Sequence, residues 1–284
     1  MSSEPSQASA PAQKQSKAGR NLPAAIGVGV VLGAVVVIGL FFQPWVLVVT
    51  AAFAAALGNW EVVSSLNQKR GMGIPIYPAV ATAFAMPFFA YIGGGQWLIF
   101  AVVASILVLI GWRLFGTKDG MIMSVMGSVF AMGWVPFMLA LAMLLFRSEN
   151  GTAAIFLCII MAIGNDTWGY VAGVLWGKHP MAPRISPKKT WEGFAGSMVG
   201  SIIVAVVSCI LLGMPWWFGV ILAVTLVVTA TTGDLAESMV KREIGIKDMS
   251  HILPGHGGVM DRLDSIVFCL AIGSVIFTIF APVL

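Results

Sequence analysis

The chain has 284 residues, of which 58% are hydrophobic and only 10% are charged, and its net charge is +4 at neutral pH. Soluble domains carry charge on about a quarter of their residues, so this composition excludes an ordinary soluble protein, and we expect no nucleic-acid partner. The apolar residues form continuous runs close to the roughly 20 residues that cross a bilayer. Continuous rather than alternating runs favour an all-α, polytopic membrane bundle over a β-barrel.

Residues 1–21 are rich in Ser, Gln, Ala and Pro and include three basic side chains. Such a segment cannot bury enough apolar surface to fold, so we expect a disordered tail. A signal peptide is the alternative, because basic residues precede an apolar run. That run is longer than the apolar part of a signal peptide and ends in no cleavage motif, which favours a retained first helix.

The hydrophobic runs predict about nine transmembrane helices, separated by breaks rich in Gly and Pro at 43–44, 93–96 and 213–215. The second helix, as bounded, is short and is expected to continue towards Leu66. In chain order the helices are expected at 24–42, 45–57, 76–92, 97–115, 121–146, 152–176, 194–212, 216–231 and 265–283.

The distribution of Lys and Arg predicts which ends of these helices face the cytoplasm, where positive charge is enriched. If the N-terminus is cytoplasmic and nine helices alternate, fifteen of the sixteen Lys and Arg residues lie on the cytoplasmic side. Arg147 alone falls outside. We therefore expect a multi-pass protein of the cell membrane, with its N-terminus and its polar segments in the cytoplasm.

A carboxylate occurs in the sixth predicted helix, at Asn165-Asp166. Charge within hydrocarbon is costly and by default indicates function. The alternatives are a structural contact between helices, or an acid that is simply protonated. Gly169, Gly173 and Gly177 form a ridge of small residues on the same helix, which is more typical of helix packing than of substrate contact.

The loop after this helix contains Ser186, Lys188, Lys189 and Thr190 in the run SPKKT. Two hydroxyls and two ammonium groups suit phosphate oxygens, which take both charge and hydrogen bonds. A positive-inside signal is the simpler interpretation of Lys178 and Arg184 in this loop. The alternative role of Glu192, near the start of the seventh helix, is a favourable charge at the helix N-terminus.

The stretch 231–265 holds six of the twelve acidic residues and is the densest polar region of the chain. If the eighth helix continues, Asp234, Glu237, Ser238 and Lys241 lie on one of its faces. Asp261 and Asp264 are three residues apart and can point into one site. Carboxylates beside cations suit Mg²⁺ with bound phosphates, since Mg²⁺ takes one or two protein carboxylates.

The same stretch contains Gly255, His256, Gly257 and Gly258. These glycines would let backbone amides approach an anion closely. A solvated loop of self-paired charges is the alternative, and it explains the glycines poorly. A structural role for His256 is the more common outcome for a lone histidine.

Three motifs, in order along the chain, resemble those of the phosphatidate cytidylyltransferases, also called CDP-diacylglycerol synthases. They are NDTWGY at 165–170, SPKKTWEG at 186–193, and SMVKR, KDMS and LPGHGGVMDRLD within 238–264. Gly169 replaces an alanine that is common in the family. The motifs cover the C-terminal half, whereas the first five helices match only in hydrophobicity.

The resemblance implies an integral-membrane homodimer that joins CTP to phosphatidic acid, releases pyrophosphate and requires Mg²⁺, with a second cation as an option. It divides the chain into transmembrane helices at 22–150 and a catalytic transmembrane region at 151–284. Metal ligands would be Asp234, Asp261 and Asp264. The other catalytic groups would be Lys241, His256 and Arg262. Substrate contacts would come from Asn165, Asp166, Ser186, Lys188, Lys189, Thr190, Glu237, Ser238, Arg242, Lys247, Asp248, Gly257 and Gly258.

Two other functions are compatible with parts of the sequence. A CTP-dependent polyprenol kinase would work in the same membrane setting but transfer the γ-phosphate. An ion- or proton-coupled transporter centred on Asp166 would show repeated halves and charge at mid-membrane, whereas the charge here is concentrated towards one face.

Overall fold

The computed structural model describes residues 22–116, 120–253 and 257–281, and the predicted tail at 1–21 lies outside these ranges. The helices are α1 (Leu22–Phe41), α2 (Pro44–Arg70), α3 (Ile76–Leu114), α4 (Met121–Trp134), α5 (Pro136–Phe146), α6 (Gly151–Trp176), α7 (Trp191–Leu211), α8 (Trp216–Ile244), α9 (Met260–Leu263) and α10 (Ile266–Phe280). A small sheet is formed by β1 (Pro180–Ala182) and β2 (Ser186–Thr190).

Most of the described helices are apolar, and several are long enough to cross a membrane. Six of them, counting Met121–Phe146 as one, are long and apolar enough to cross a bilayer, and two shorter apolar helices, Gly27–Phe41 and Ile266–Phe280, accompany them. The predicted all-α, multi-pass membrane fold is confirmed. The predicted number of about nine spans stays a prediction.

Helix α3 folds back on itself at Gly94, whose φ of 70° is non-helical. The rings of Phe89 and Phe100 lie 5.9 Å apart, whereas eleven residues of straight helix would span about 16 Å. The two parts of α3 therefore correspond to two of the predicted helices, and the reversal falls at the expected 93–96 break.

The fifth predicted helix, 121–146, is interrupted in the structure. Val135, with φ −110° and ψ −64°, separates α4 from α5, and Pro136 occupies the first turn of α5. Proline has no backbone N–H to donate to the preceding turn and tends to kink a helix at this point. The predicted range 121–146 agrees with the span in the structure, and only the interruption at Val135 was not predicted.

Two further differences concern the polar segments. Helix α8 continues to Ile244, thirteen residues beyond the predicted boundary at 231, so the polar residues from Asp234 onward are helical. The loop after α6 forms an antiparallel hairpin that pairs Pro180 with Thr190 and Ala182 with Ser186. An all-α prediction did not include this hairpin.

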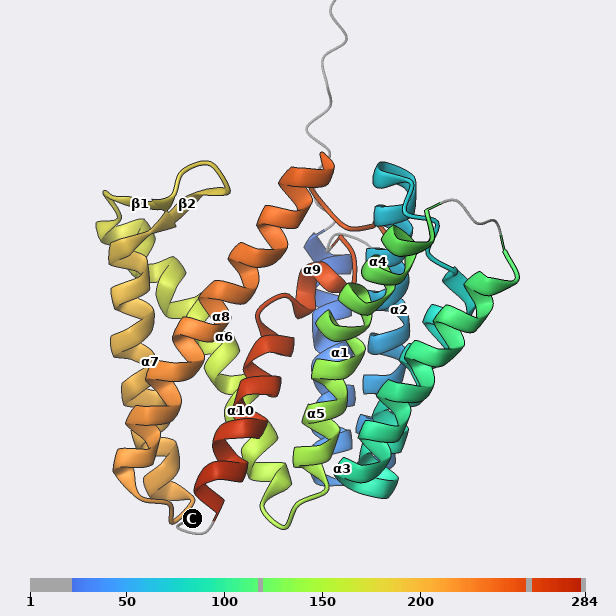
Figure 1. Ribbon diagram of the computed structural model, residues 1–284. Coiled ribbons are helices and arrows are strands. Elements are labelled where there is room, and N and C mark those ends of the chain that lie inside the picture. Colours follow the sequence, from blue (N-terminus) through green and yellow to red (C-terminus); the bar gives the residue numbers. More distant parts are fainter. Residues whose placement is uncertain (1–21, 117–119, 254–256, 282–284) are drawn as a thin grey trace, which may run out of the picture.

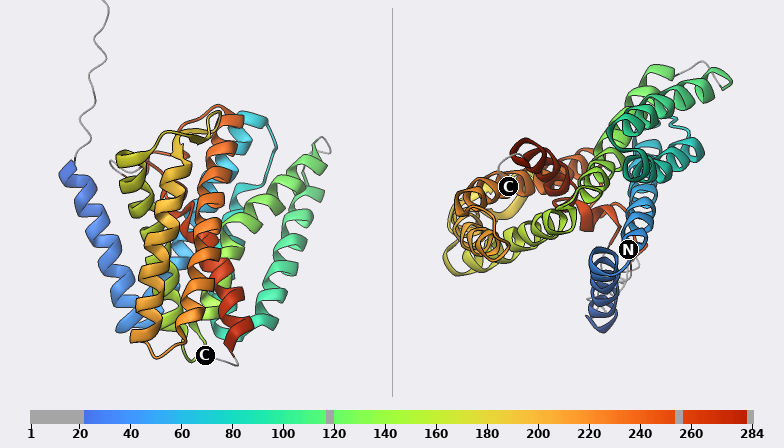
Figure 2. Two further views of the ribbon diagram at one scale, coloured as in Figure 1. Left: turned by 90° about the vertical axis from the view of Figure 1, so that its left-hand side faces the viewer. Right: turned by 90° about the horizontal axis from the view of Figure 1, so that it is seen from below.

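The helices form two groups joined in the middle (Figure 1). Helices α6, α7 and α8 pack together on one side, α2 and α3 pack together on the other, and α5 and α10 lie between them. The first described turn of α1 lies at the end of the bundle that carries the hairpin, and α10 ends at the opposite end (Figure 2). We call the end with the hairpin the polar end.

Candidate active site

A cavity of about 210 Å³ opens beneath the hairpin, between α6, α7 and β2. It brings together residues of two motifs from the sequence, NDTWGY at 165–170 and SPKKTWEG at 186–193. Its lining residues are Asn165, Asp166, Gly169, Tyr170, Met181, Lys188, Lys189, Thr190, Gly193, Phe194, Ser197 and Thr231. Acidic, amide, hydroxyl and ammonium groups thus share one hollow in an otherwise apolar bundle.

An ion pair links the hairpin to α8. The Lys189 Nζ atom lies 2.5 Å from the Asp234 Oδ2 atom, and both side chains are about three-quarters buried. An ammonium group held beside a carboxylate at the mouth of a cavity can exchange that partner for a phosphate oxygen. The structure therefore joins the SPKKT motif to the start of the 231–265 stretch.

Helices α6 and α7, which pack closely together, form one wall of the cavity. A Cβ atom built on Gly193 would lie 2.9 Å from the carbonyl oxygen of Gly169, so this crossing requires a residue without a side chain. The expected packing role of the Gly169 ridge is confirmed. Thr190 begins α7 as its N-cap, where its hydroxyl accepts the Gly193 N–H at 3.1 Å, a typical capping arrangement.

Asn165 connects the three helices of this group. Its side chain donates to Asp166 at 3.2 Å and accepts from the Thr231 hydroxyl on α8 at 3.4 Å, while its backbone oxygen accepts from Ser197 on α7 at 2.6 Å. Asn165 itself is 5% exposed. Asp166 is thereby directed into the cavity rather than used as a contact between helices.

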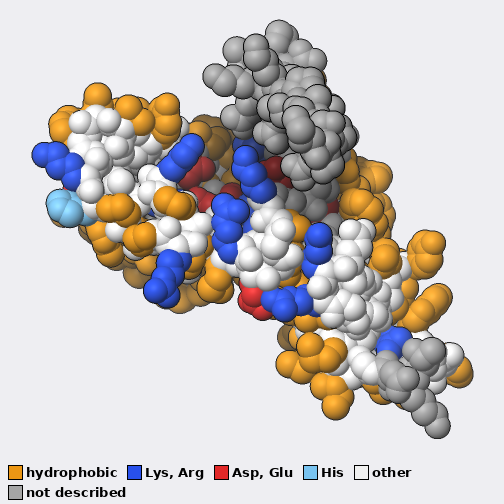
Figure 3. All heavy atoms as spheres, turned by 90° about the horizontal axis from the view of Figure 1, so that it is seen from above, with side chains coloured by type: hydrophobic (Ala, Val, Ile, Leu, Met, Phe, Trp, Pro, Cys, Tyr) orange, Lys and Arg blue, Asp and Glu red, His pale blue; other side chains and the backbone are white. Residues whose placement is uncertain are grey.

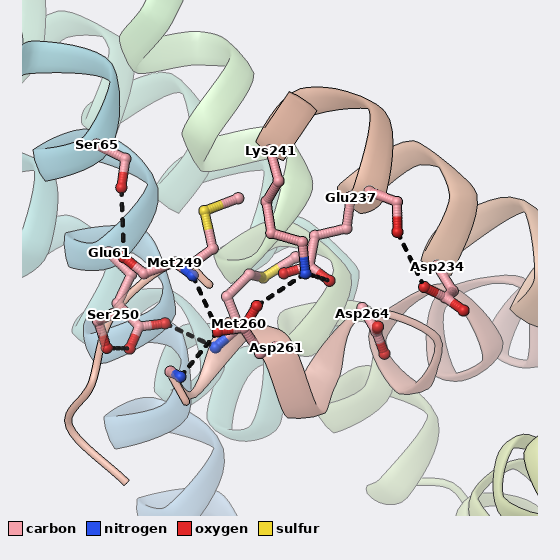
Figure 4. A network of polar contacts seen from close by, with 12 residues as sticks. Glu61, Ser65, Asp234, Glu237, Lys241, Met249, Ser250, Met260, Asp261 and Asp264 are labelled. Atoms are coloured by element: carbon pink, nitrogen blue, oxygen red, sulfur yellow. Dashed lines mark hydrogen bonds and ion pairs between the residues drawn. The ribbon is translucent and has the colours of Figure 1, made fainter. Parts of the chain in front are cut away.

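The polar face of α8 is assembled as predicted from the helical spacing (Figure 4). Ser238 donates to Asp234 at 3.4 Å, and Lys241 pairs with Glu237 at 3.2 Å and with Asp261 at 2.8 Å. Glu237 is completely buried beneath Lys241. The expected contact between Glu237 and substrate stays a prediction. In the structure, its carboxylate pairs with the Lys241 ammonium group.

Asp261 is held from several sides. Its Oδ1 atom accepts from Lys241, and its Oδ2 atom accepts the N–H groups of Met249 at 2.9 Å and Gly258 at 2.8 Å. Burial alone would raise the pKa of the Asp261 carboxyl, but these hydrogen bonds outweigh burial and hold the pKa below its ordinary value. Asp261 is therefore an ionised and fixed carboxylate at neutral pH.

Asp264 has a different environment. Burial, together with repulsion from Asp234, raises the pKa of the Asp264 carboxyl to about 6. One of its oxygens accepts the N–H of Ser265 at 2.6 Å. A cation bound beside Asp264 would offset the repulsion that raises the pKa of this carboxyl.

These carboxylates offer a partial fit to the implied Mg²⁺. Over the described ranges, no three acidic, His or Cys side chains converge closely enough to form a ready-made metal site. Asp261 is directed to Lys241, whereas Asp234 and Asp264 are close enough to repel each other. Mg²⁺ needs only one or two protein carboxylates when phosphates and water complete its shell, so the residues suit the metal, and the three-ligand assignment stays a prediction.

On the polar end, Lys and Arg side chains gather around acidic ones (Figure 3). Arg242, Lys247, Asp248 and Arg262 are exposed, and Ser186 is half-buried at the start of β2. Gly257 has a left-handed φ of 82°, and Gly258 is buried. The predictions for Gly255 and His256 fall outside the described residues.

One buried acid was missed by sequence reasoning. Glu61 on α2 is 1% exposed, and it accepts hydrogen bonds from the Ser250 hydroxyl at 2.5 Å, the Val259 N–H at 2.8 Å and the Met260 N–H at 2.7 Å. The available signal was the single acid of a membrane-length helix, of the kind that marked Asp166. The site thus also involves the N-terminal half of the chain.

The fold and the site together define a multi-pass membrane protein with a polar, phosphate-compatible site at one end of its helical bundle. Residues 23–280 match the model of the cytidylyltransferase family, and the chain belongs to this family.

Curated relatives match nearly the whole chain. A phosphatidate cytidylyltransferase of Mycobacterium bovis is 40% identical over 271 residues, which cover 90% of this chain and 88% of the relative. The phosphatidate cytidylyltransferase of Mycobacterium tuberculosis (strain H37Rv) is also 40% identical, over 90% of this chain and 82% of its own length. That of Mycobacterium leprae is 38% identical, with coverages of 88% and 86%.

Proposed function

We infer that this protein transfers CMP from CTP to phosphatidic acid and thereby forms CDP-diacylglycerol and pyrophosphate. The observation that carries this inference is the 40% identity, over 90% of the chain, to relatives named phosphatidate cytidylyltransferase. The geometry supports it, because phosphate-binding groups lie at one end of a membrane bundle, where a lipid head group and a soluble nucleotide can meet.

The reaction needs little acid–base chemistry from the protein. A phosphomonoester has a second pKa near 6, so the attacking phosphate is already largely dianionic at neutral pH. Its oxygen forms a bond to the α-phosphorus of CTP, and the bond from that phosphorus to the β-phosphate bridging oxygen breaks. The task of the site is to bring two polyanions together and to stabilise charge on the departing pyrophosphate.

We expect residues of the candidate site to supply that stabilisation. Lys188 and Lys189 line the cavity and would contact phosphate oxygens, while Asp234 holds Lys189 in place before substrate binds. Asp234 and Asp264, with Asp261 as the third expected ligand, would hold Mg²⁺, which would neutralise phosphate charge. Lys241 keeps Asp261 ionised and fixed.

We also propose that the polar end faces the cytoplasm, where CTP is present. The described Lys and Arg residues at the ends of α2, α3, α6 and α8 support this orientation, because the positive-inside bias then holds. Cysteine substituted at Arg184, in the hairpin, is expected to react with an impermeant thiol reagent only in inside-out vesicles. Labelling of this cysteine in intact cells would contradict the proposed orientation and place the polar end outside the cell.

The homodimer implied by the resemblance stays a prediction, and light scattering of the detergent-solubilised protein measures it. The transporter alternative gains nothing from the structure, since Asp166 lies in the same cavity as the two lysines.

Replacing Lys189 with alanine is expected to raise the apparent KM for a phosphate-bearing substrate about tenfold or more, because a hydrogen bond to a charged group contributes about 1.5–3 kcal/mol. Steady-state kinetics with CTP and phosphatidate varied in turn identify which substrate is affected. Arg184→Ala is the matched control, because Arg184 lies in the same hairpin, is exposed and does not line the cavity. Unchanged KM and kcat in Lys189→Ala would leave the SPKKT run as a topology signal alone.

The proposed function itself is tested with purified protein in detergent. Pyrophosphate release is expected only when CTP, phosphatidate and Mg²⁺ are all present, together with a new cytidine-containing lipid. Release without lipid, or no release, would refute it.

A further inference from the structure

Two carboxylates on opposite sides hold residues 249–253 and 257–260, which together we call the acid-held segment. From one side, Asp261 accepts the backbone N–H groups of Met249 and Gly258. From the other, Glu61 accepts the Ser250 hydroxyl and the N–H of Val259 with its Oε1 atom, and the N–H of Met260 with its Oε2 atom. Figure 4 shows the two acids on either side of this segment.

Glu61 is suited to holding backbone rather than binding substrate. Its side chain is buried within the bundle, in a helix long and apolar enough to span the membrane. A carboxylate in such a place is costly unless its oxygens are hydrogen-bonded. The three donors named above come from one short stretch of chain, so satisfying the carboxylate also fixes the position of that stretch.

The glycines of the segment fit both acids. A Cβ atom on Gly258 would lie 2.7 Å from both carboxylate oxygens of Glu61, so any larger residue would push Glu61 away. Gly257 adopts a φ of 82°, and a Cβ atom there would lie 3.0 Å from the Oδ2 atom of Asp261. The two adjacent glycines allow the two carboxylates to approach the segment together.

The two sets of bonds are connected through the backbone. Gly258 donates to Asp261, and the next two residues, Val259 and Met260, donate to Glu61. Asp261 follows immediately. The direction in which Asp261 leaves the backbone is therefore set by a residue on α2, about 200 positions away in the chain.

We infer that Glu61 is a positioning residue for Asp261: it holds the acid-held segment so that the Asp261 carboxylate lies against Lys241, on the side of the site formed by α8. This inference rests on the proposed function for its kinetic consequence, but not for its structural one. Glu61 itself is not among the residues that line the cavity.

Glu61→Gln tests this inference with little change in shape. One oxygen of glutamine can still accept from Ser250 and Val259, but its amide –NH₂ group then faces the Met260 N–H, and that hydrogen bond is lost. Amide hydrogen exchange across 249–263, measured without Mg²⁺ or substrate, reports on the segment directly. The kcat and the KM for CTP report on the reaction.

Asn59→Ala is the matched control. Asn59 lies on the same helix, is 2% exposed and donates to the backbone oxygen of Ala79 on α3 at 2.9 Å, so its loss perturbs the bundle without touching the segment. Ser250→Ala is a second, milder variant, which removes one donor to Glu61 and leaves the buried carboxylate in place.

In Glu61→Gln we expect faster exchange at Val259 and Met260 and a kcat about 10- to 100-fold lower, the range seen when a group that orients a ligand is altered, with little change in the KM for CTP. Ser250→Ala should change the hydrogen exchange and the kcat in the same direction but by smaller amounts. Asn59→Ala should change neither the exchange nor the kcat.

The inference would be overturned if Glu61→Gln and Ser250→Ala showed the same hydrogen exchange and the same kcat as the wild-type protein. Equal losses in Asn59→Ala would also overturn it, because Glu61 would then contribute only to bundle stability. If the wild-type protein forms no CDP-diacylglycerol, the proposed function fails, while the exchange comparison still decides whether Glu61 holds the segment.

Discussion

Asp261→Asn is expected to abolish turnover while the protein still folds and inserts into the membrane. The substitution keeps the shape of the side chain but removes its charge, and one of its two oxygens becomes an –NH₂ group. That group would face either Lys241 or the backbone N–H groups of Met249 and Gly258, which are all donors. Loss of an ionised metal ligand, together with displacement of the Lys241 ammonium that it holds, is expected to lower kcat by about a hundredfold or more.

The measurement is the kcat of purified Asp261→Asn protein that elutes as the wild type does in size-exclusion chromatography. Glu243→Gln is the control, because Glu243 is an exposed acid at the end of α8 that pairs with Arg70, away from the cavity. Near-normal turnover in Asp261→Asn would refute the role assigned to this carboxylate.

Lys241→Met is expected to be the most destabilising substitution in the site. The Lys241 side chain is 13% exposed and pairs with Glu237, which is fully buried, and with Asp261, which is 7% exposed. Methionine fills a similar volume but leaves two buried carboxylates without their cation. Removing one partner of a buried ion pair costs about 3–5 kcal/mol, a large part of the stability of most folded proteins.

Thermal unfolding in detergent measures this loss as a lowered midpoint. The double variant Lys241→Met with Glu237→Gln should recover part of it, because one of the two uncompensated charges is then absent. A Lys241→Met protein as stable as the wild type would show that the three side chains do not depend on each other. Activity should fall with stability in the single variant, since Asp261 loses its partner.

Much of the fold was predictable because the bilayer constrains it. Continuous apolar runs must be helical, and the breaks at Gly94 and at 213–215 were visible as glycine and proline clusters. The break at Val135 was less visible, because a single proline within an apolar run can either kink a helix or be accommodated in it. The hairpin at 180–190 lies outside the apolar runs, where periodicity gives little information.

The site was predictable where its residues are close in sequence. Helical spacing on α8 correctly brought Asp234, Ser238 and Lys241 to one face, whereas the sequence marked Asp166 as functional without showing which cavity it lines. Spacing could not show that Lys189 pairs with Asp234, or that Asp261 is directed to Lys241. These contacts depend on the packing of helices that are distant in the chain.

Glu61 illustrates the same limit most clearly. It lies in α2, in the half of the chain where the sequence resembled the family only in hydrophobicity, and its partners are about 190 to 200 residues away. A single acid in a membrane-length helix indicates a function or a buried partner. Only the three-dimensional arrangement identifies that partner as the backbone beside Asp261.

The central claim, that CMP rather than the terminal phosphate is transferred to the lipid, is tested most directly with CTP labelled at either the α- or the γ-phosphate. The purified protein is incubated with phosphatidate and Mg²⁺, and the lipid is extracted. We expect the α-label in the lipid, as CDP-diacylglycerol, and the γ-label in pyrophosphate. Recovery of the γ-label in the lipid, with release of CDP, would contradict the account and identify a lipid kinase.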